Sequence, residues 1–402
     1  DVFIDFISYD GTDKANLSID NLKDIKIEII NATIDGYLFL PSKKIIINST
    51  RLDSKKYFSL YKKTLDKNSG LEANKLQFKI VGIDKIYSTK INNVKSLVSN
   101  NKKVNYIKNK TGNFERFDFI DINFASKVIK ITPGSYQLSS DLVIPKNYKF
   151  IIEKGTTIDL INNANIVSYS PIYLIGTELH PIKIFSTDLS GQGISVINAK
   201  EKSFLSNLSI TKLSKPNKEG IYLSGSINFY QSPVEIKKLD ISNNNSEDAL
   251  NIIKSDYSIS DSRFYNIFSD AFDGDFSNGK IINTKFIDCG NDAIDVSGSI
   301  VMIESIYIEN AADKGLSIGE NSHLKGSNLT IKKSEIGITS KDLSSVELNN
   351  VLIEDTAIGF TAYQKKSEYG PAKITIQNYQ SKNIEREYLI ELNSIMIMDK
   401  DI

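Results

Sequence analysis

Hydrophobic and polar positions repeat with a long period over the C-terminal part of the chain. Six segments, most pairing a small residue with a large apolar one, begin 22 residues apart: Asp248–Asn251, Asp270–Asp273, Asp292–Asp295, Lys314–Ser317, Ile336–Thr339 and Ile358–Thr361. A second apolar series lies upstream in each unit, at Phe264, Phe286, Ile308, Ile331 and Ile353. A unit this short cannot bury its own apolar face, so copies must stack. The pattern predicts a parallel β-solenoid with one coil per repeat.

The segments before these repeats look like earlier coils. They are Ile131–Tyr136, Ser140–Pro145, Phe150–Ile158 and Gly176–Phe185. This stretch resembles the opening coils of right-handed parallel β-helix proteins of the pectate-lyase-like superfamily. The resemblance implies a right-handed parallel β-helix over residues 126–402. It does not settle activity, because that superfamily includes lyases, hydrolases, epimerases, adhesins and passive scaffolds.

Residues 1–125 lack the 22-residue period. Alternating or buried apolar runs there predict strands at Ile25–Ile30, Tyr37–Leu40, Lys44–Ile47 and Leu76–Val81. Polar, lysine-rich residues 96–113 are typical of a linker. We therefore expect an all-β chain in which a small β-rich, sandwich-like accessory domain with its linker (1–125) precedes the solenoid (126–402).

The amino-acid composition limits the classes of partner that we expect this protein to bind. The 402 residues carry 49 Lys+Arg and 49 Asp+Glu, which argues against a general nucleic-acid binder, since such proteins show a basic excess. No apolar run approaches the roughly 18 residues of a membrane span. The chain starts at Asp1 without a charged-then-apolar leader, so we expect a mature or trimmed segment. Any electrostatic function must be local.

One such local feature is an acidic patch. Residues 241–300 hold ten acids and four bases. Because side chains alternate along a strand, Asp273 and Asp295 should face outward, and Asp248, Asp270 and Asp292 should form a second column at the bend. Neighbouring coils lie about 4.8 Å apart, and two carboxylates about 5 Å apart repel by roughly 3 kcal/mol at an effective dielectric of 20. Either some carboxyls keep their protons or a cation neutralises the group.

An all-oxygen ligand set favours Ca²⁺ over zinc, which prefers His or Cys. His180, His323 and Cys289 lie away from the patch in the predicted solenoid. The predicted calcium ligands are Asp248, Asp270, Asp273, Asp292 and Asp295.

Lys314 follows Asp292 in the second column. An acidic cluster with a stacked lysine resembles the sites of calcium-dependent pectate lyases with β-helix folds. The resemblance implies that the five aspartates bind Ca²⁺ and that Lys314 is the general base in β-elimination of an acidic (uronate) polysaccharide. That role requires partial burial and the bound cation to lower the pKa of Lys314. A polymer substrate would place the protein outside the cytoplasm, as an extracellular, cell-surface or periplasmic protein.

Four other interpretations stay open. Lys314 could simply neutralise the acidic column, and the aspartates could serve only as turn residues at the solenoid corners. A glycoside hydrolase needs two carboxyls, which Asp270, Asp273, Asp292 and Asp295 could supply. A non-catalytic carbohydrate-binding or surface scaffold module would bind glycan or metal without turnover.

Overall fold

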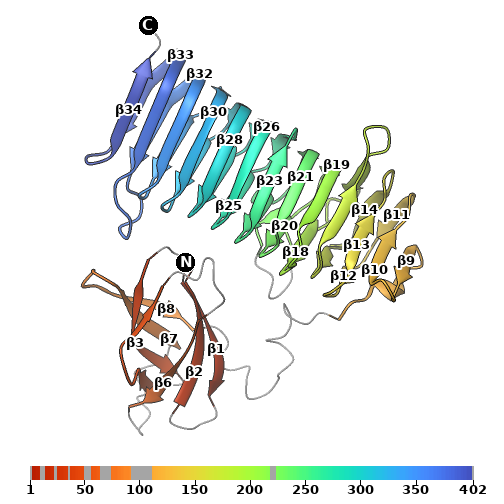
Figure 1. The fold of residues 1–402 in the computed structure, drawn as a ribbon, viewed down its shortest axis with the longest axis horizontal. Helices are drawn as coiled ribbons and strands as arrows, with labels where there is room; N and C mark the ends of the chain where they lie inside the picture. Colours follow the sequence, from red (N-terminus) through yellow and green to blue (C-terminus); the bar gives the residue numbers. More distant parts are fainter. Residues whose placement is uncertain are drawn as a thin grey trace. The chain divides into compact units, whose positions relative to one another are not determined.

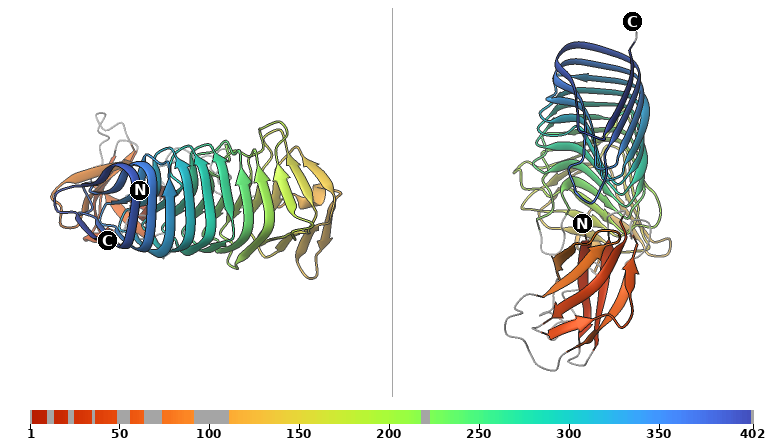
Figure 2. Two further views of the ribbon diagram at one scale, coloured as in Figure 1. Left: turned by 90° about the horizontal axis from the view of Figure 1, so that it is seen from above. Right: turned by 90° about the vertical axis from the view of Figure 1, so that its left-hand side faces the viewer.

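A computed structural model describes residues 2–9, 14–21, 25–34, 37–48, 56–63, 74–91, 111–217 and 223–400. The chain divides into two compact units, Asp1–Asn109 and Lys110–Ile402. The second unit is a parallel β-solenoid of about 12 turns of about 22 residues (Figures 1 and 2). Among the described residues there is no α-helix and no helix that could cross a membrane. The predicted solenoid is confirmed.

Three parallel sheets run along the solenoid, each receiving one strand from every coil. Sheet 1 contains β12 (Leu142–Ile144), β15 (Ile166–Ser168), β18 (Ile194–Ile197), β20 (Gly225–Tyr230), β22 (Asp248–Ile253), β25 (Asp270–Asp275), β27 (Ile294–Ser297), β29 (Lys314–Gly319) and β31 (Ile336–Lys341). Its last strand segments belong to β32 (Ser345–Tyr363) and β33 (Lys373–Ile390).

The other two sheets share several long strands that turn a corner between them. Sheet 2 begins with β10 (Val128–Ile131), β13 (Lys149–Ile152) and β16 (Ile172–Ile175), and it includes β23 (Asp256–Ser260) and β34 (Ile395–Lys400). Sheet 3 begins with β11 (Ser135–Leu138), β14 (Thr157–Leu160) and β17 (Ile182–Phe185), and it includes β24 (Arg263–Ile267). Both contain parts of β19 (Ser203–Thr211), β21 (Val234–Ser242), β26 (Asn278–Cys289), β28 (Ile300–Ala311), β30 (His323–Lys332), β32 and β33.

The core consists of apolar columns that follow the predicted repeat. In sheet 1 the column runs through Leu250, Phe272, Ile294, Leu316, Ile338 and Phe360, all fully buried. In sheet 3 the second predicted series stacks in register, and the rings of Phe264 and Phe286 lie 4.9 Å apart. Each buried side chain therefore packs against its counterparts in the coils before and after it.

Two kinds of polar ladder hold the coils together. At the corners, residues with positive φ stack from coil to coil, and their side chains bond, as from Asn310 Nδ2 to Asp288 Oδ1 at 2.7 Å and from Asn350 Nδ2 to Asn328 Oδ1 at 2.6 Å. Asn and Asp tolerate this left-handed backbone better than most residues.

A buried serine ladder runs beside sheet 1. The backbone N–H of each serine donates to the hydroxyl of the serine one coil later, at 2.8–3.2 Å, through Ser232, Ser255, Ser277, Ser299, Ser322 and Ser344. These hydroxyls satisfy backbone donors that sheet pairing leaves unbonded.

The first unit is one antiparallel sheet of eight strands: β1 (Val2–Tyr9), β2 (Lys14–Asn21), β3 (Ile27–Ile34), β4 (Tyr37–Leu40), β5 (Ile45–Ile47), β6 (Lys56–Lys62), β7 (Lys75–Ile80) and β8 (Ile86–Lys90). The β-rich domain is thus present. Its described strands join in a single sheet, with β1 and β8 in contact, rather than in the two sheets of a sandwich.

Residues 110–125 belong to the solenoid unit, so the boundary lies earlier than predicted, after Asn109. Strand β9 (Ile120–Asn123) pairs antiparallel with β10, and a 3₁₀ turn at Phe114–Arg116 precedes it. Phe114 and Ile120 are buried in the solenoid core. This segment has no 22-residue repeat because it covers the first coil instead of continuing the stack. Of the predicted linker, residues 96–113, only 111–113 are among the described residues.

Ile294→Ala tests the stacked core. The truncation leaves a cavity in a fully buried column, and such cavities cost about 2–5 kcal/mol of unfolding free energy. Denaturant unfolding of the whole chain measures the loss. Ile300→Ala, at a side chain 58% exposed on β28, is the matched control, and we expect a change within about 0.5 kcal/mol. Equal losses in both variants would contradict the stacked-core arrangement.

Candidate functional site

The predicted aspartates lie on sheet 1 in two columns. Asp273 on β25 is in register with Asn251 on β22 and with Asp295 on β27. Asp248 is in register with Asp270, and Asp292 follows Asp270 one coil later. The structure thus forms both carboxyl columns as the alternation predicted, with Asn251 at the start of the first.

Asp270 and Asp292 are tied together at the bend. The backbone N–H of Asp292 donates to Asp270 Oδ1 at 2.8 Å, and Asn291 Nδ2 donates to the same oxygen at 2.7 Å. Asp270 is partly exposed, whereas Asp292 is 3% exposed. Of this pair, Asp270 therefore has the better access to solvent.

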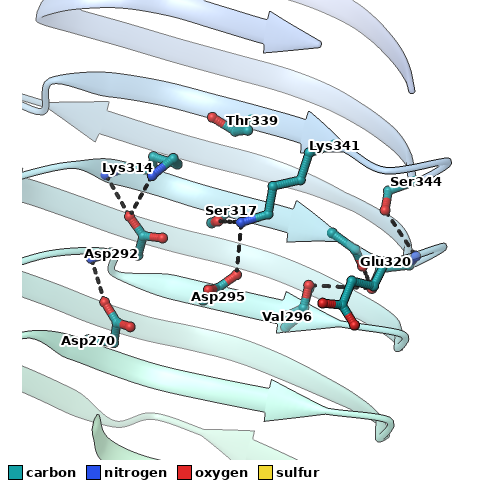
Figure 3. Close-up of polar contacts among 12 residues, drawn as sticks. Asp270, Asp292, Asp295, Val296, Lys314, Ser317, Glu320, Thr339, Lys341 and Ser344 are labelled. Carbon is teal, nitrogen blue, oxygen red and sulfur yellow. Dashed lines mark hydrogen bonds and ion pairs between the residues drawn. The ribbon is translucent and has the colours of Figure 1, made fainter. Parts of the chain in front are cut away.

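Lys314 closes the second column. Its backbone N–H donates to Asp292 Oδ1 at 3.0 Å, and its ammonium lies 3.4 Å from the same oxygen (Figure 3). The ammonium also pairs with Asp313. Burial alone would lower the pKa of Lys314, but the charges of Asp292 and Asp313 and the bond to Asp313 outweigh it, so the pKa lies above its ordinary value. This shift is opposite to the one that a general base at Lys314 would require.

The first column ends differently. Ser317 follows Asp295 in register, and the cation comes from Lys341 on β31. Its Nζ donates to Ser317 Oγ at 2.8 Å and lies 3.8 Å from Asp295 Oδ1 (Figure 3). Each carboxyl column is therefore closed by a lysine ammonium at its C-terminal end. Sequence reasoning missed Lys341, because it lies two coils beyond Asp295 and outside the column of the aspartates.

The carboxyls farther from these lysines retain protons more strongly. Burial, with repulsion from neighbouring carboxylates, raises the pKa of Asp248 and of Asp273 well above the ordinary range. Burial is also the main cause for Asp270, whose pKa rises to about 7, and for Asp292, whose pKa rises to about 6 although Lys314 opposes the rise. The negative charge of the aspartate columns is thus neutralised partly by protons bound to the carboxyls and partly by the two lysine ammonium groups.

The predicted calcium ligands do not fit a metal ion in this arrangement. Their oxygens suit Ca²⁺ chemically, but the ammonium groups of Lys314 and Lys341 already lie against Asp292 and Asp295. No group of three or more His, Cys, Asp or Glu side chains in the described part of the chain is arranged to hold a metal.

An exposed aromatic side chain lies beside the columns and was also missed from sequence. Phe268, 65% exposed, sits in the corner between β24 and β25, two residues before Asp270. Its backbone N–H donates to Asn244 Oδ1 at 3.1 Å. A Cβ on Gly290 would come within 2.1 Å of its carbonyl oxygen, so this corner is tightly packed while the ring faces solvent.

Comparison with known proteins yields fold-level likeness only. No protein-family model matches the sequence, and no curated protein matches it. Among solved structures, the catalytic domain of a GH87 α-1,3-glucanase in complex with tetrasaccharides is 12% identical, with a TM-score of 0.39 and coverage of 98% of this chain and 91% of that one.

An alginate lyase from Paenibacillus is 11% identical, with a TM-score of 0.37 over 63% of this chain and 100% of that one. A tailspike protein of an Escherichia coli O157:H7 bacteriophage is 11% identical, with a TM-score of 0.36 over 69% and 39%. At these values the likenesses carry no argument about activity.

The raised pKa values predict an unusual pH dependence. The folded-state pKa of about 7 for Asp270 and about 6 for Asp292 exceed the ordinary value of 3.8 expected in the unfolded chain. The folded protein therefore holds these protons more tightly, and this stabilisation is complete below the unfolded value and is lost as pH rises through 6 and 7. We expect the thermal midpoint to fall between about pH 5 and pH 8.

Asp270→Asn should flatten this dependence and raise the midpoint at the alkaline end, because Asn mimics the protonated acid and can still accept the bonds from Asn291 and Asp292. Asp261→Asn is the matched control at an exposed corner position, and it should keep the slope of the unchanged protein. A melting curve that does not respond to Asp270→Asn would refute the assignment.

Proposed function

We propose that the chain is a carbohydrate-active β-solenoid protein that hydrolyses a neutral polysaccharide on sheet 1, with Asp273 as proton donor and Asp295 as the partner carboxylate. The observation that carries this proposal is the register of Asp273 with Asp295, which places two outward carboxyls on strands of adjacent coils, or rungs, of the solenoid. Rungs lie about 4.8 Å apart, close to the 5–5.5 Å or so between the carboxyls of retaining glycosidases.

The surroundings of the two carboxyls differ in the way that acid–base pairs require. Asp273 accepts one hydrogen bond, from Asn251 Nδ2 to Oδ2 at 2.9 Å, and burial favours its neutral, proton-bearing form. Asp295, its side chain 26% exposed, pairs with the Lys341 ammonium instead. One carboxyl can therefore give a proton while the other carries charge.

The reaction that suits this pair has two steps. Asp273 protonates the glycosidic oxygen as the bond to the anomeric carbon breaks, and the Asp295 carboxylate forms a bond to that carbon. Water then attacks the glycosyl ester, giving its proton to Asp273 and releasing Asp295. Asp270 and Asp292 remain beside the pair, and their charge state tunes it through space.

The lysine of the lyase mechanism has less support. A general base must be able to accept a proton, whereas Lys314 is held as an ammonium by Asp292 and Asp313. We therefore assign Lys314 to charge neutralisation, one of the alternatives that the sequence left open.

A neutral glycan is favoured over an acidic one by the local charge. The lysines of this face, Lys314 and Lys341, have side chains only 12% and 11% exposed and are engaged with aspartates. Little positive charge is therefore left to bind uronate carboxylates. The exposed ring of Phe268 instead offers an apolar surface for a sugar ring. Work on a polymer would again place the protein outside the cytoplasm.

Hydrolysis is tested with a panel of neutral and uronate polysaccharides, measuring new reducing ends together with unsaturated-product absorbance. We expect reducing ends from a neutral polymer, without unsaturation and without added calcium. Asp273→Asn and Asp295→Asn should each lower the rate by at least about a hundredfold, the usual scale for losing an acid–base group, while Asp261→Asn keeps it. Unsaturated product that disappears in Lys314→Ala would instead establish the lyase; no product from any polymer would leave the scaffold interpretation.

The carboxyl spacing also predicts stereochemistry. Products released by a pair this close should retain the anomeric configuration of the substrate. Proton NMR of the anomeric signal in the first minutes of reaction distinguishes the outcomes. Inversion would mean that a more distant pair acts, such as Asp270 with Asp295.

A further inference from the structure

Lys341 reaches the carboxyl column through a space left by a glycine. Gly319 lies between Ser297 and Lys341 in the same outward column of sheet 1. A Cβ on Gly319 would come within 2.7 Å of Lys341 Cε and 3.2 Å of its Cγ. The lysine stem therefore lies flat over this glycine and carries the ammonium back toward Asp295, two coils earlier (Figure 3).

The ammonium has few partners at the end of this path. Its hydrogen bond is to Ser317 Oγ at 2.8 Å, and Asp295 Oδ1 lies 3.8 Å away. Asp295 Oδ1 is buried and has no hydrogen-bond partner among the described residues. Its neutralisation thus depends on the charge of Lys341.

A second buried oxygen of the column is also unsatisfied. Asn251, 1% exposed, donates through Nδ2 to Asp273, while its Oδ1 has no hydrogen-bond partner in the described part of the chain. Carboxylate, amide and hydroxyl oxygens from Asn251, Asp273, Asp295 and Ser317 therefore follow one another along one column. Oxygen atoms are the ligands that Ca²⁺ binds in proteins.

We propose that Lys341 is a built-in counter-ion that occupies a latent calcium site, so that the column works without metal and becomes a Ca²⁺ site only when Lys341 or its path over Gly319 is removed. This inference does not rest on the proposed hydrolysis, since it concerns the charge balance of the folded chain alone. It makes Gly319 a positioning residue for the ammonium.

Lys341→Met tests this proposal, because methionine keeps an unbranched stem and removes the charge. Without metal, the variant should melt at a lower temperature, since a buried carboxylate loses its partner. Added calcium chloride should restore the midpoint, and calorimetry should give a Ca²⁺ dissociation constant about tenfold or more below that of the unchanged protein, a gain of about 1.4 kcal/mol. Lys341→Met/Asp295→Asn should lose the calcium response.

Lys325→Met is the matched control. Its side chain is 69% exposed and pairs with Glu347 on the next strand of sheet 2, away from the carboxyl columns of sheet 1. The thermal midpoint of this variant should therefore not change with added calcium, as in the unchanged protein. If Lys341→Met does not fold, Gly319→Ala is measured instead, and a calcium response is again expected because the added methyl displaces the lysine stem. Calcium binding by the unchanged protein as tight as by the variants, or no response in the variant that folds, would overturn the proposal.

Discussion

Coil stacking forces like side chains to lie one rung apart, and this constraint governs the carboxyl columns. Aspartates repeated at one position must either repel or be neutralised, because the rung spacing of about 4.8 Å cannot relax without breaking the backbone ladder. Here the neutralisation is graded along the solenoid. Toward the N-terminal end, burial raises the pKa of Asp248 and Asp273 and so favours their protonated forms. Toward the C-terminal end, the ammonium groups of Lys314 and Lys341 lie against Asp292 and Asp295.

That gradient connects the fold to the proposed chemistry. Adjacent rungs place Asp273 and Asp295 in the same column, yet only Asp295 lies beside an ammonium. Two identical side chains therefore acquire different electrostatic surroundings from position alone. The same gradient is consistent with the proposed role of Lys314 as a counter-ion of the second column rather than a general base.

Much of the solenoid was predictable, because stacking turns a local pattern into a global one. The repeat located the core residues from Leu250 to Phe360 and both aspartate columns, since strand alternation fixes which side chains face outward. The serine ladder was not predictable, because a buried hydroxyl that accepts from the preceding coil has the same sequence pattern as a turn. The segment carrying Phe114 and Ile120 was also misassigned, since a cap has no repeat to reveal it.

The role of Lys341 lay beyond sequence reasoning for a different reason. Its ammonium acts two coils away from its own backbone, and its path depends on the missing side chain of Gly319. The most direct test of the account is a high-resolution crystal structure of the unchanged protein soaked in calcium chloride. We expect the Lys341 ammonium to lie against Ser317 and Asp295, with no ion in the column. Calcium bound by Asp273 and Asp295 with the lysine displaced would contradict it.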